Sequence, residues 1–124
     1  GLMDPRHATC GEVTQNRLRE LGIQEAVQKN VKVEQRSHVD LATAIRMDHL
    51  DAAVVWNFIG VLNAKDLDVI TTDDQYPQIN VTICMLKCAE NSDGSRQLLK
   101  LAASEYGLQT FARKGYVTTE SKKP

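Results

Sequence analysis

Residues 36–56, RSHVDLATAIRMDHLDAAVVW, constrain the fold of this chain more than any other stretch. Ser37 is a favourable N-cap, and Asp40 three residues later completes a capping box. Apolar residues then recur at helical spacing, which predicts a helix that begins near His38. The run 52–56 is continuously apolar, as in a strand covered on both faces. We therefore expect a helix followed directly by a buried strand.

Composition excludes several classes of protein. With 124 residues the chain is long enough for one domain, and its 15 basic and 16 acidic residues give a formal charge of -1. A nucleic-acid surface requires concentrated Lys and Arg, so no nucleic-acid partner is expected. No run approaches the roughly 18 apolar residues of a membrane-spanning helix. These features predict a single globular domain, with neither duplex binding nor membrane insertion indicated.

The three cysteines favour neither a disulfide framework nor a metal site. In a strand, Cys84 and Cys88 would lie about 13 Å apart, too far to pair. Their spacing lacks the second close pair of Cys or His that zinc requires. We expect Cys10, Cys84 and Cys88 to be small buried thiols, with no metal and no cofactor.

Along the chain, further strands and helices alternate. Helices are expected from Thr9 to a stop at Gly22, in the following residues 23–30, in residues 57–67, from Ser92 or Asp93 to Gly107, and over residues 108–114. Strands are expected at residues 31–33, 66–71 and 79–86. This alternation predicts an α/β fold, a three-layer sandwich with a mainly parallel sheet flanked by helices. Residues 1–116 would form a single lobe and 117–124 a flexible tail.

Ligands of such sheets collect beyond the carboxyl ends of the strands, where helix N-termini also gather. Two helix starts, near Cys10 and Val39, and one strand end, at Trp56, could meet there. Unpaired N–H groups would then line a pocket suited to an oxyanion. The alternative is that Thr9 and Ser37 are ordinary caps and that Trp56 is a core aromatic.

Several short motifs, in order, resemble one family of binding proteins. They are MDPRH at 3–7, Cys10-Gly11, SHV at 37–39, LDAAVVW at 50–56, Tyr76-Pro77 and FARKGY at 111–116. The chain resembles the second lobe of periplasmic molybdate-binding proteins, which are solute-binding components of ABC transporters. The resemblance implies one lobe of a type II periplasmic-binding fold that binds a tetrahedral oxyanion such as molybdate or tungstate.

The resemblance also implies three donors from this lobe. They are the backbone N–H groups of Cys10 and Val39, and the side chain of Trp56 at a position where the family has tyrosine. Both Cys10 and Trp56 depart from the family pattern, so the resemblance does not specify which anion is bound. His7 and His38 lie beside the donors and are expected to face solvent.

Further partners follow from the same resemblance. A first lobe would precede this chain and close over the ligand by a hinge, residues 78–116 would pack partly on it, and an ABC permease would receive the ligand. A periplasmic or extracytoplasmic location is implied. Without the first lobe, apolar surfaces of residues 79–86 and 98–106 would be left open, so the isolated lobe is expected to form a homodimer.

Three other functions stay open. The lobe could be the effector-sensing domain of a transcriptional regulator, identified by an upstream DNA-binding module, or it could bind a different small anion. It could also be an enzyme with Cys10 as a low-pKa nucleophile at a helix start, although the sequence places no base beside it. The expected protein is not an enzyme.

Overall fold

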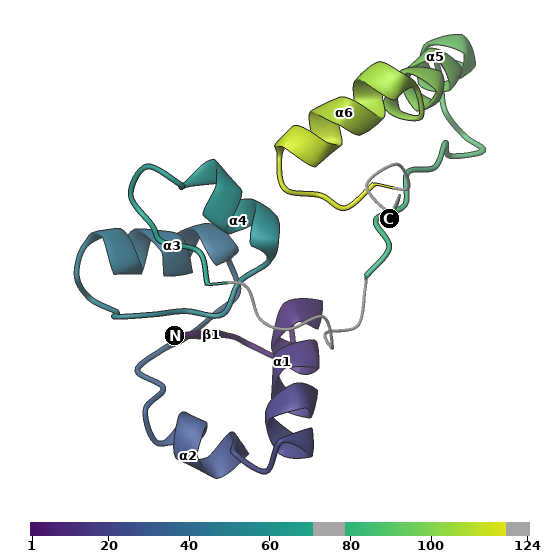
Figure 1. Cartoon of the computed structure of the whole chain (residues 1–124). Coiled ribbons are helices and arrows are strands. Elements are labelled where there is room, and N and C mark those ends of the chain that lie inside the picture. Colours follow the sequence, from purple (N-terminus) through teal and green to yellow (C-terminus); the bar gives the residue numbers. More distant parts are fainter. Residues whose placement is uncertain (71–78, 119–124) are drawn as a thin grey trace. The chain divides into compact units, whose positions relative to one another are not determined.

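The computed structural model describes residues 1–70 and 79–118 of the chain (Figure 1). The chain divides into two compact units, Gly1–Pro77 and Gln78–Pro124. The first unit contains β1 (Leu2–Met3), α1 (Thr9–Glu20), α2 (Gln24–Gln28), β2 (Glu34–Gln35), α3 (His38–Arg46) and α4 (Asn57–Leu62). The second contains α5 (Ser92–Ala102) and α6 (Glu105–Arg113). The regular secondary structure of the described residues is therefore mainly helical.

The sheet of the first unit consists of two short parallel strands. β1 pairs with β2 in the register Leu2 to Glu34 and Met3 to Gln35. The strand expected at residues 31–33 is therefore found at Glu34–Gln35 instead. Of the expected residues, only Val33 bonds to β1, through its carbonyl, which accepts from the Leu2 N–H at 3.1 Å. The described residues show this sheet among helices, and the three-layer sandwich remains an expectation.

The run expected as a strand at residues 52–56 is extended but is not a strand. The Gly1 amino group donates to the Ala52 carbonyl at 2.7 Å, and the Val54 N–H donates to the Gly1 carbonyl at 3.2 Å. These two bonds follow the pattern of a parallel pair. These bonds hold the segment beside the start of β1, although residues 52–56 are not assigned to a strand.

Helix α1 packs closely on β1. The chain turns at residues 4–8 before α1 begins at Thr9, as the sequence predicted, although Ala8 is the N-cap and gives no side-chain cap. A Cβ on Gly11 would collide with the backbone of Met3, Asp4 and Pro5. Gly22 has a positive φ of 68° beyond the end of α1, which confirms the predicted stop.

Helix α3 begins as its capping sequence predicts. The Ser37 side chain accepts from the Asp40 N–H at 3.4 Å. Leu41, one turn later, is fully buried, and Met3, Cys10, Leu41 and Leu50 together form the buried core cluster. The capped helix therefore presents its apolar face to the strand and to the start of α1.

The helix expected at residues 57–67 is confirmed only for residues 57–62, because α4 ends at Leu62 and the chain turns at residues 63–66. Gly60 is buried, and a Cβ there would collide with the Val69 side chain. Glycine lowers helix propensity, but at this position it permits close packing of the following segment.

Two other expected strands are wrong within the described residues. Residues 66–70 and 79–86 form no strand, and the apolar side chains of Ile70 and Val81 are 90% and 78% exposed. Their β-branched patterns favour extended backbone, but a strand also needs a neighbour for its N–H and C=O groups. Thr71, and most of the tail expected at 117–124, lie outside the described residues.

The second unit is a pair of capped helices. Asn91 accepts from the Gly94 N–H at 2.8 Å and caps α5, which begins at Ser92 as predicted. Gly107 does not close this helix, because α5 ends at Ala102 and Ser104 caps α6 with a bond from the Gly107 N–H at 3.2 Å. Gly107 is buried inside α6, which begins three residues before the expected segment at 108.

Candidate functional site

The starts of α1 and α3 lie at one edge of the sheet. β1 leads through residues 4–8 into α1, and β2 leads through residues 36–37 into α3 (Figure 1). Because β1 and β2 are parallel, their carboxyl ends meet at the same edge. The two connecting loops also meet, since Arg36 Nε lies 4.0 Å from Asp4 Oδ2. This edge is where the sequence placed the candidate donors.

Cys10 is the second residue of α1 and its side chain points into the core. It is 3% exposed and belongs to the buried cluster. Burial raises the pKa of the Cys10 thiol to about 11, although a hydrogen bond with Thr14 acts in the opposite direction. The expectation of a buried thiol is confirmed here, and a low-pKa nucleophile at Cys10 is contradicted. Cys84 and Cys88 are instead exposed, because the segment that carries them is not a buried strand.

The backbone of Cys10 is nevertheless suited to donate. Its N–H lies in the first turn of α1, where a helix provides no acceptor for its own N–H groups. No other acceptor for it is found within residues 1–70 and 79–118. The thiol of Cys10 therefore packs in the core, while its N–H has no acceptor among the described residues.

Val39 is the second residue of α3 and is 64% exposed. Ser37 supplies acceptors to the neighbouring N–H groups, its hydroxyl to Asp40 and its carbonyl to Leu41, both at 3.4 Å. The part of the chain that the structure describes offers no acceptor to the Val39 N–H itself. This group is consequently available to a ligand without displacing an existing bond.

Trp56 is the N-cap residue of α4 and is half-buried against the core cluster that contains Cys10. Its ring lies 6.3 Å from that of His38, centroid to centroid, with 46° between the planes. Since His38 precedes Val39, this contact brings the indole to the start of α3. The structure thus places Trp56 beside the segment of Val39 and against the cluster of Cys10.

A charged cluster at the same edge was missed by sequence reasoning. The buried Asp4 carboxylate accepts from the Arg6 backbone N–H and side chain at 3.0 Å and contacts His7 Nδ1 at 2.9 Å. These bonds, led by the Arg6 side chain, hold the pKa of Asp4 far below its usual value of 3.8. Arg6, Arg36 and Asp4 together carry one excess positive charge at neutral pH. The sequence signal that could have indicated this cluster is the motif DPRH at 4–7, in which an acidic residue lies within three residues of two basic ones.

The expectation that His38 faces solvent is wrong. His38 is half-buried between Trp56 and Phe58, whose ring lies edge-on at 6.4 Å. His7, in contrast, has a side chain that is 42% exposed and contacts Asp4. A histidine just inside a cap is typical of a solvent-facing position, and only the approach of α4 buries it.

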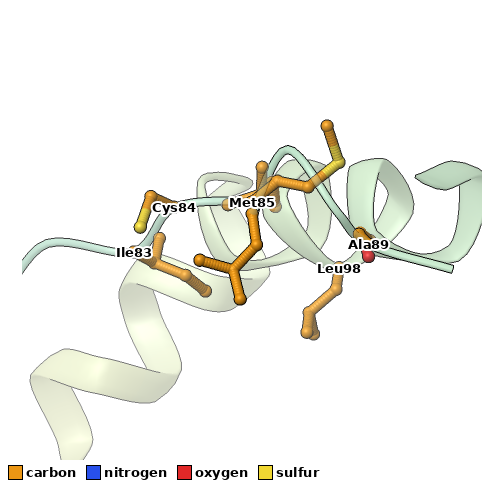
Figure 2. A pocket seen from close by; sticks show the side chains of 8 residues that line it. Ile83, Cys84, Met85, Ala89 and Leu98 are labelled. Atoms are coloured by element: carbon orange, nitrogen blue, oxygen red, sulfur yellow. The ribbon is translucent and has the colours of Figure 1, made fainter. Parts of the chain in front are cut away.

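The second unit contains a separate apolar hollow. It has a volume of about 240 Å³ and lies between residues 83–89 and helix α5 (Figure 2). Its walls include Ile83, Met85 and Leu98, with no charged side chain. A second hollow, in the first unit, is lined by Arg46 and Asp66. Neither hollow contains the expected donors.

Residues 1–70 and 79–118 contain no helix long and apolar enough to cross a membrane. The same residues contain no group of three or more His, Cys, Asp or Glu side chains arranged to hold a metal ion.

Comparison with known proteins gives one match. The family model for bacterial extracellular solute-binding proteins matches residues 1–117. No curated protein and no solved structure matches the chain. The match covers both compact units and the whole of the sheet edge described above.

Proposed function

The chain belongs to the bacterial extracellular solute-binding protein family, and from this membership we propose that it is one lobe of a binding protein for a small oxyanion. The family places it in a binding role outside the cytoplasm, with a small-molecule ligand and an ABC permease as partner. This extracellular role favours transport over the sensing of an effector inside the cell.

The observation that supports the proposal is that α1 and α3 both begin at the same edge of the sheet. Two helices of 12 and 9 residues begin at this edge, and their first N–H groups and dipoles favour an anion. The proposed donors are the Cys10 N–H, the Val39 N–H and the indole N–H of Trp56. Arg6 and Arg36 add positive charge in the loops at this edge of the sheet, which increases the rate of anion association.

Selection of the anion would depend on geometry. Fixed backbone donors discriminate tetrahedral dianions by the size of the space between them, because an anion that is too small leaves donors unpaired. We propose molybdate or tungstate as the ligand class, held between this lobe and a second lobe by hinge closure, in a three-layer α/β arrangement of each lobe. An indole donates only one hydrogen bond and accepts none, so Trp56 suits a fully ionised anion.

The test is calorimetric titration of the full-length protein that contains this chain with molybdate, tungstate and sulfate. The key variant is Val39→Pro, which removes the N–H at a position that makes no intrahelical bond, with the helix content compared by circular dichroism because proline disfavours helical backbone at the preceding His38. It is expected to weaken binding about 10- to 100-fold, equivalent to the about 1.5–3 kcal/mol of a hydrogen bond to a charged group. Val39→Ala keeps the N–H and should bind normally.

Trp56 provides an independent arm of the same titration. Trp56→Phe keeps an aromatic ring but removes the donor, whereas Trp56→Tyr supplies a hydroxyl donor. Weaker binding by the first variant and retained binding by the second would support the assignment. An absence of heat with all three anions, in protein shown to be folded by circular dichroism, would overturn the oxyanion proposal.

A further inference from the structure

His38 joins the two elements that carry the proposed donors. It is the first residue of α3, and Val39 follows it. Its ring contacts Trp56 at 6.3 Å and Phe58 at 6.4 Å, the second at an interplanar angle of 66°. The Trp56 contact is tilted and the Phe58 contact is edge-on, and aromatic pairs at such centroid distances are favourable. The imidazole is therefore packed between the start of α3 and both aromatic residues at the start of α4.

The interior side of this imidazole carries no polar contact. Its Nδ1 is fully buried and has no hydrogen-bond partner within the described residues. Protonation would place a charged N–H at this buried position without an acceptor, which is costly whichever tautomer precedes it. The packed arrangement consequently belongs to the neutral imidazole.

Among residues 1–70 and 79–118, His38 forms no ion pair that would offset that cost. The sequence of α4, NFIGVL, contains no titratable side chain. On the α3 side, Asp40 is exposed, and Arg36 lies against Asp4 at 4.0 Å. Consistent with this setting, burial lowers the pKa of His38 from its usual 6.5.

We propose that His38 is a positioning residue, whose neutral ring holds Trp56 at the start of α3 so that the indole and the Val39 N–H act on the same ligand. This role rests on the proposed function and adds a regulation of the same site. Protonation of His38 in mild acid would release the packed ring, separate the two donors and weaken anion binding. The affinity of the binding protein for its ligand would then be highest at pH values above the one at which His38 titrates.

The first experiment needs no ligand, because Trp56 is the only tryptophan of the chain. Its fluorescence is followed between about pH 5 and pH 8, the range in which histidine titrates. A change in emission with its midpoint below pH 6.5, the unperturbed value, is expected. His38→Phe keeps an aromatic ring but cannot titrate, so the change should vanish, whereas His49→Gln removes another histidine and should retain it.

Two results of this experiment would overturn the proposal. One is emission in the unsubstituted chain that does not change with pH, and the other is a change that persists in His38→Phe. Helix content by circular dichroism, measured on the same samples, separates a local event at Trp56 from unfolding. A change in emission that coincides with general loss of helix would also count against the role.

The second experiment titrates molybdate at neutral pH. His38→Ala removes the packing of Trp56 and should weaken binding about tenfold, while His38→Phe should bind within about threefold of the unsubstituted protein. Equal affinity of His38→Ala and the unsubstituted protein would overturn the positioning role. If no variant binds any anion while the His38-dependent emission change is present, the proposed function fails and the coupling of His38 to Trp56 stands.

Discussion

At the scale of the residue, Asp4 has the most altered chemistry in the described chain. Its carboxylate is 6% exposed, yet it accepts from Arg6 and His7, and its own N–H donates to the Gln35 carbonyl at 2.8 Å. Asp4 therefore connects the end of β1 to β2 and to the turn before α1. Because Arg6 and Arg36 are 75% and 70% exposed, water screens their charges, and the hydrogen bonds rather than the ion pairs carry the effect.

The lowered pKa of Asp4 predicts a specific loss of stability in acid. A group whose folded pKa lies below its unfolded value of 3.8 stabilises the fold above that value, and the contribution disappears as the pH falls below it. In Asp4→Asn, the melting temperature should be lower at neutral pH and should fall less steeply below about pH 4. Thermal melts across this range test it, and an equally steep fall in the variant would contradict the assignment.

At the scale of the element, two glycines allow the start of a helix to approach the backbone of the preceding segment closely. Gly11 and Gly107 both lie near the start of a helix and approach backbone from another element, Met3 to Pro5 in one case and Leu101 and Ala102 in the other. Glycine at these positions is costly for the isolated helix. Glycine is nevertheless required at positions 11 and 107, because any side chain there would displace main-chain atoms.

Gly107→Ala and Gly94→Ala form a matched pair of substitutions in the second unit. Both should gain helix propensity, but a Cβ at Gly107 collides with backbone carbonyls, whereas one at Gly94 meets the Asn91 side chain at 2.9 Å, which can shift only by weakening its cap bond to the Gly94 N–H. We expect Gly107→Ala to destabilise by about 1–3 kcal/mol and Gly94→Ala to change stability by less than about 1 kcal/mol, because the gain in helix propensity offsets the weaker cap. Denaturant titration of both distinguishes these outcomes, and equal stabilities would show that the α5–α6 turn adapts freely.

At the scale of the whole molecule, the second unit has unusually exposed apolar side chains. No residue of α5 is buried, and its apolar stripe includes Leu98 and Leu101, which are 59% and 53% exposed. Residues 79–86 add Val81, Ile83 and Leu86, at 78%, 55% and 66%. Such a surface marks an interaction site. We propose that it meets another lobe in the full protein and a second copy of the chain when it is isolated.

Sedimentation velocity tests this proposal on the 124-residue chain. A dimer is expected at concentrations of tens of micromolar, and Leu98→Lys should convert it to monomer by placing a charge in the contact. Gln97→Lys, on the adjacent exposed position, adds the same charge outside the stripe and should leave the dimer intact. A monomer at every concentration would remove the homodimer.

The sequence by itself determined the local features, because each depends on neighbours in the chain. Ser37 and Asp40 set the start of α3, Gly22 ended α1, and the residues around Asn91 set the start of α5. The same local reasoning placed two helix starts near Cys10 and Val39, and the resemblance then named their N–H groups as donors. Membership of the solute-binding proteins also followed from ordered local motifs, whereas molybdate specificity stays a proposal.

Only the tertiary structure decided which features meet. Strand patterns at 66–71 and 79–86 could not reveal that the described parts of these segments lack a pairing neighbour, and Asp4 gains its partners only where two loops join. His38 looks solvent-facing in the sequence and becomes half-buried because Trp56 and Phe58 approach from α4. Burial and pairing depend on residues distant in sequence, so the sequence determines where helices start, while the fold determines what surrounds each residue at those starts.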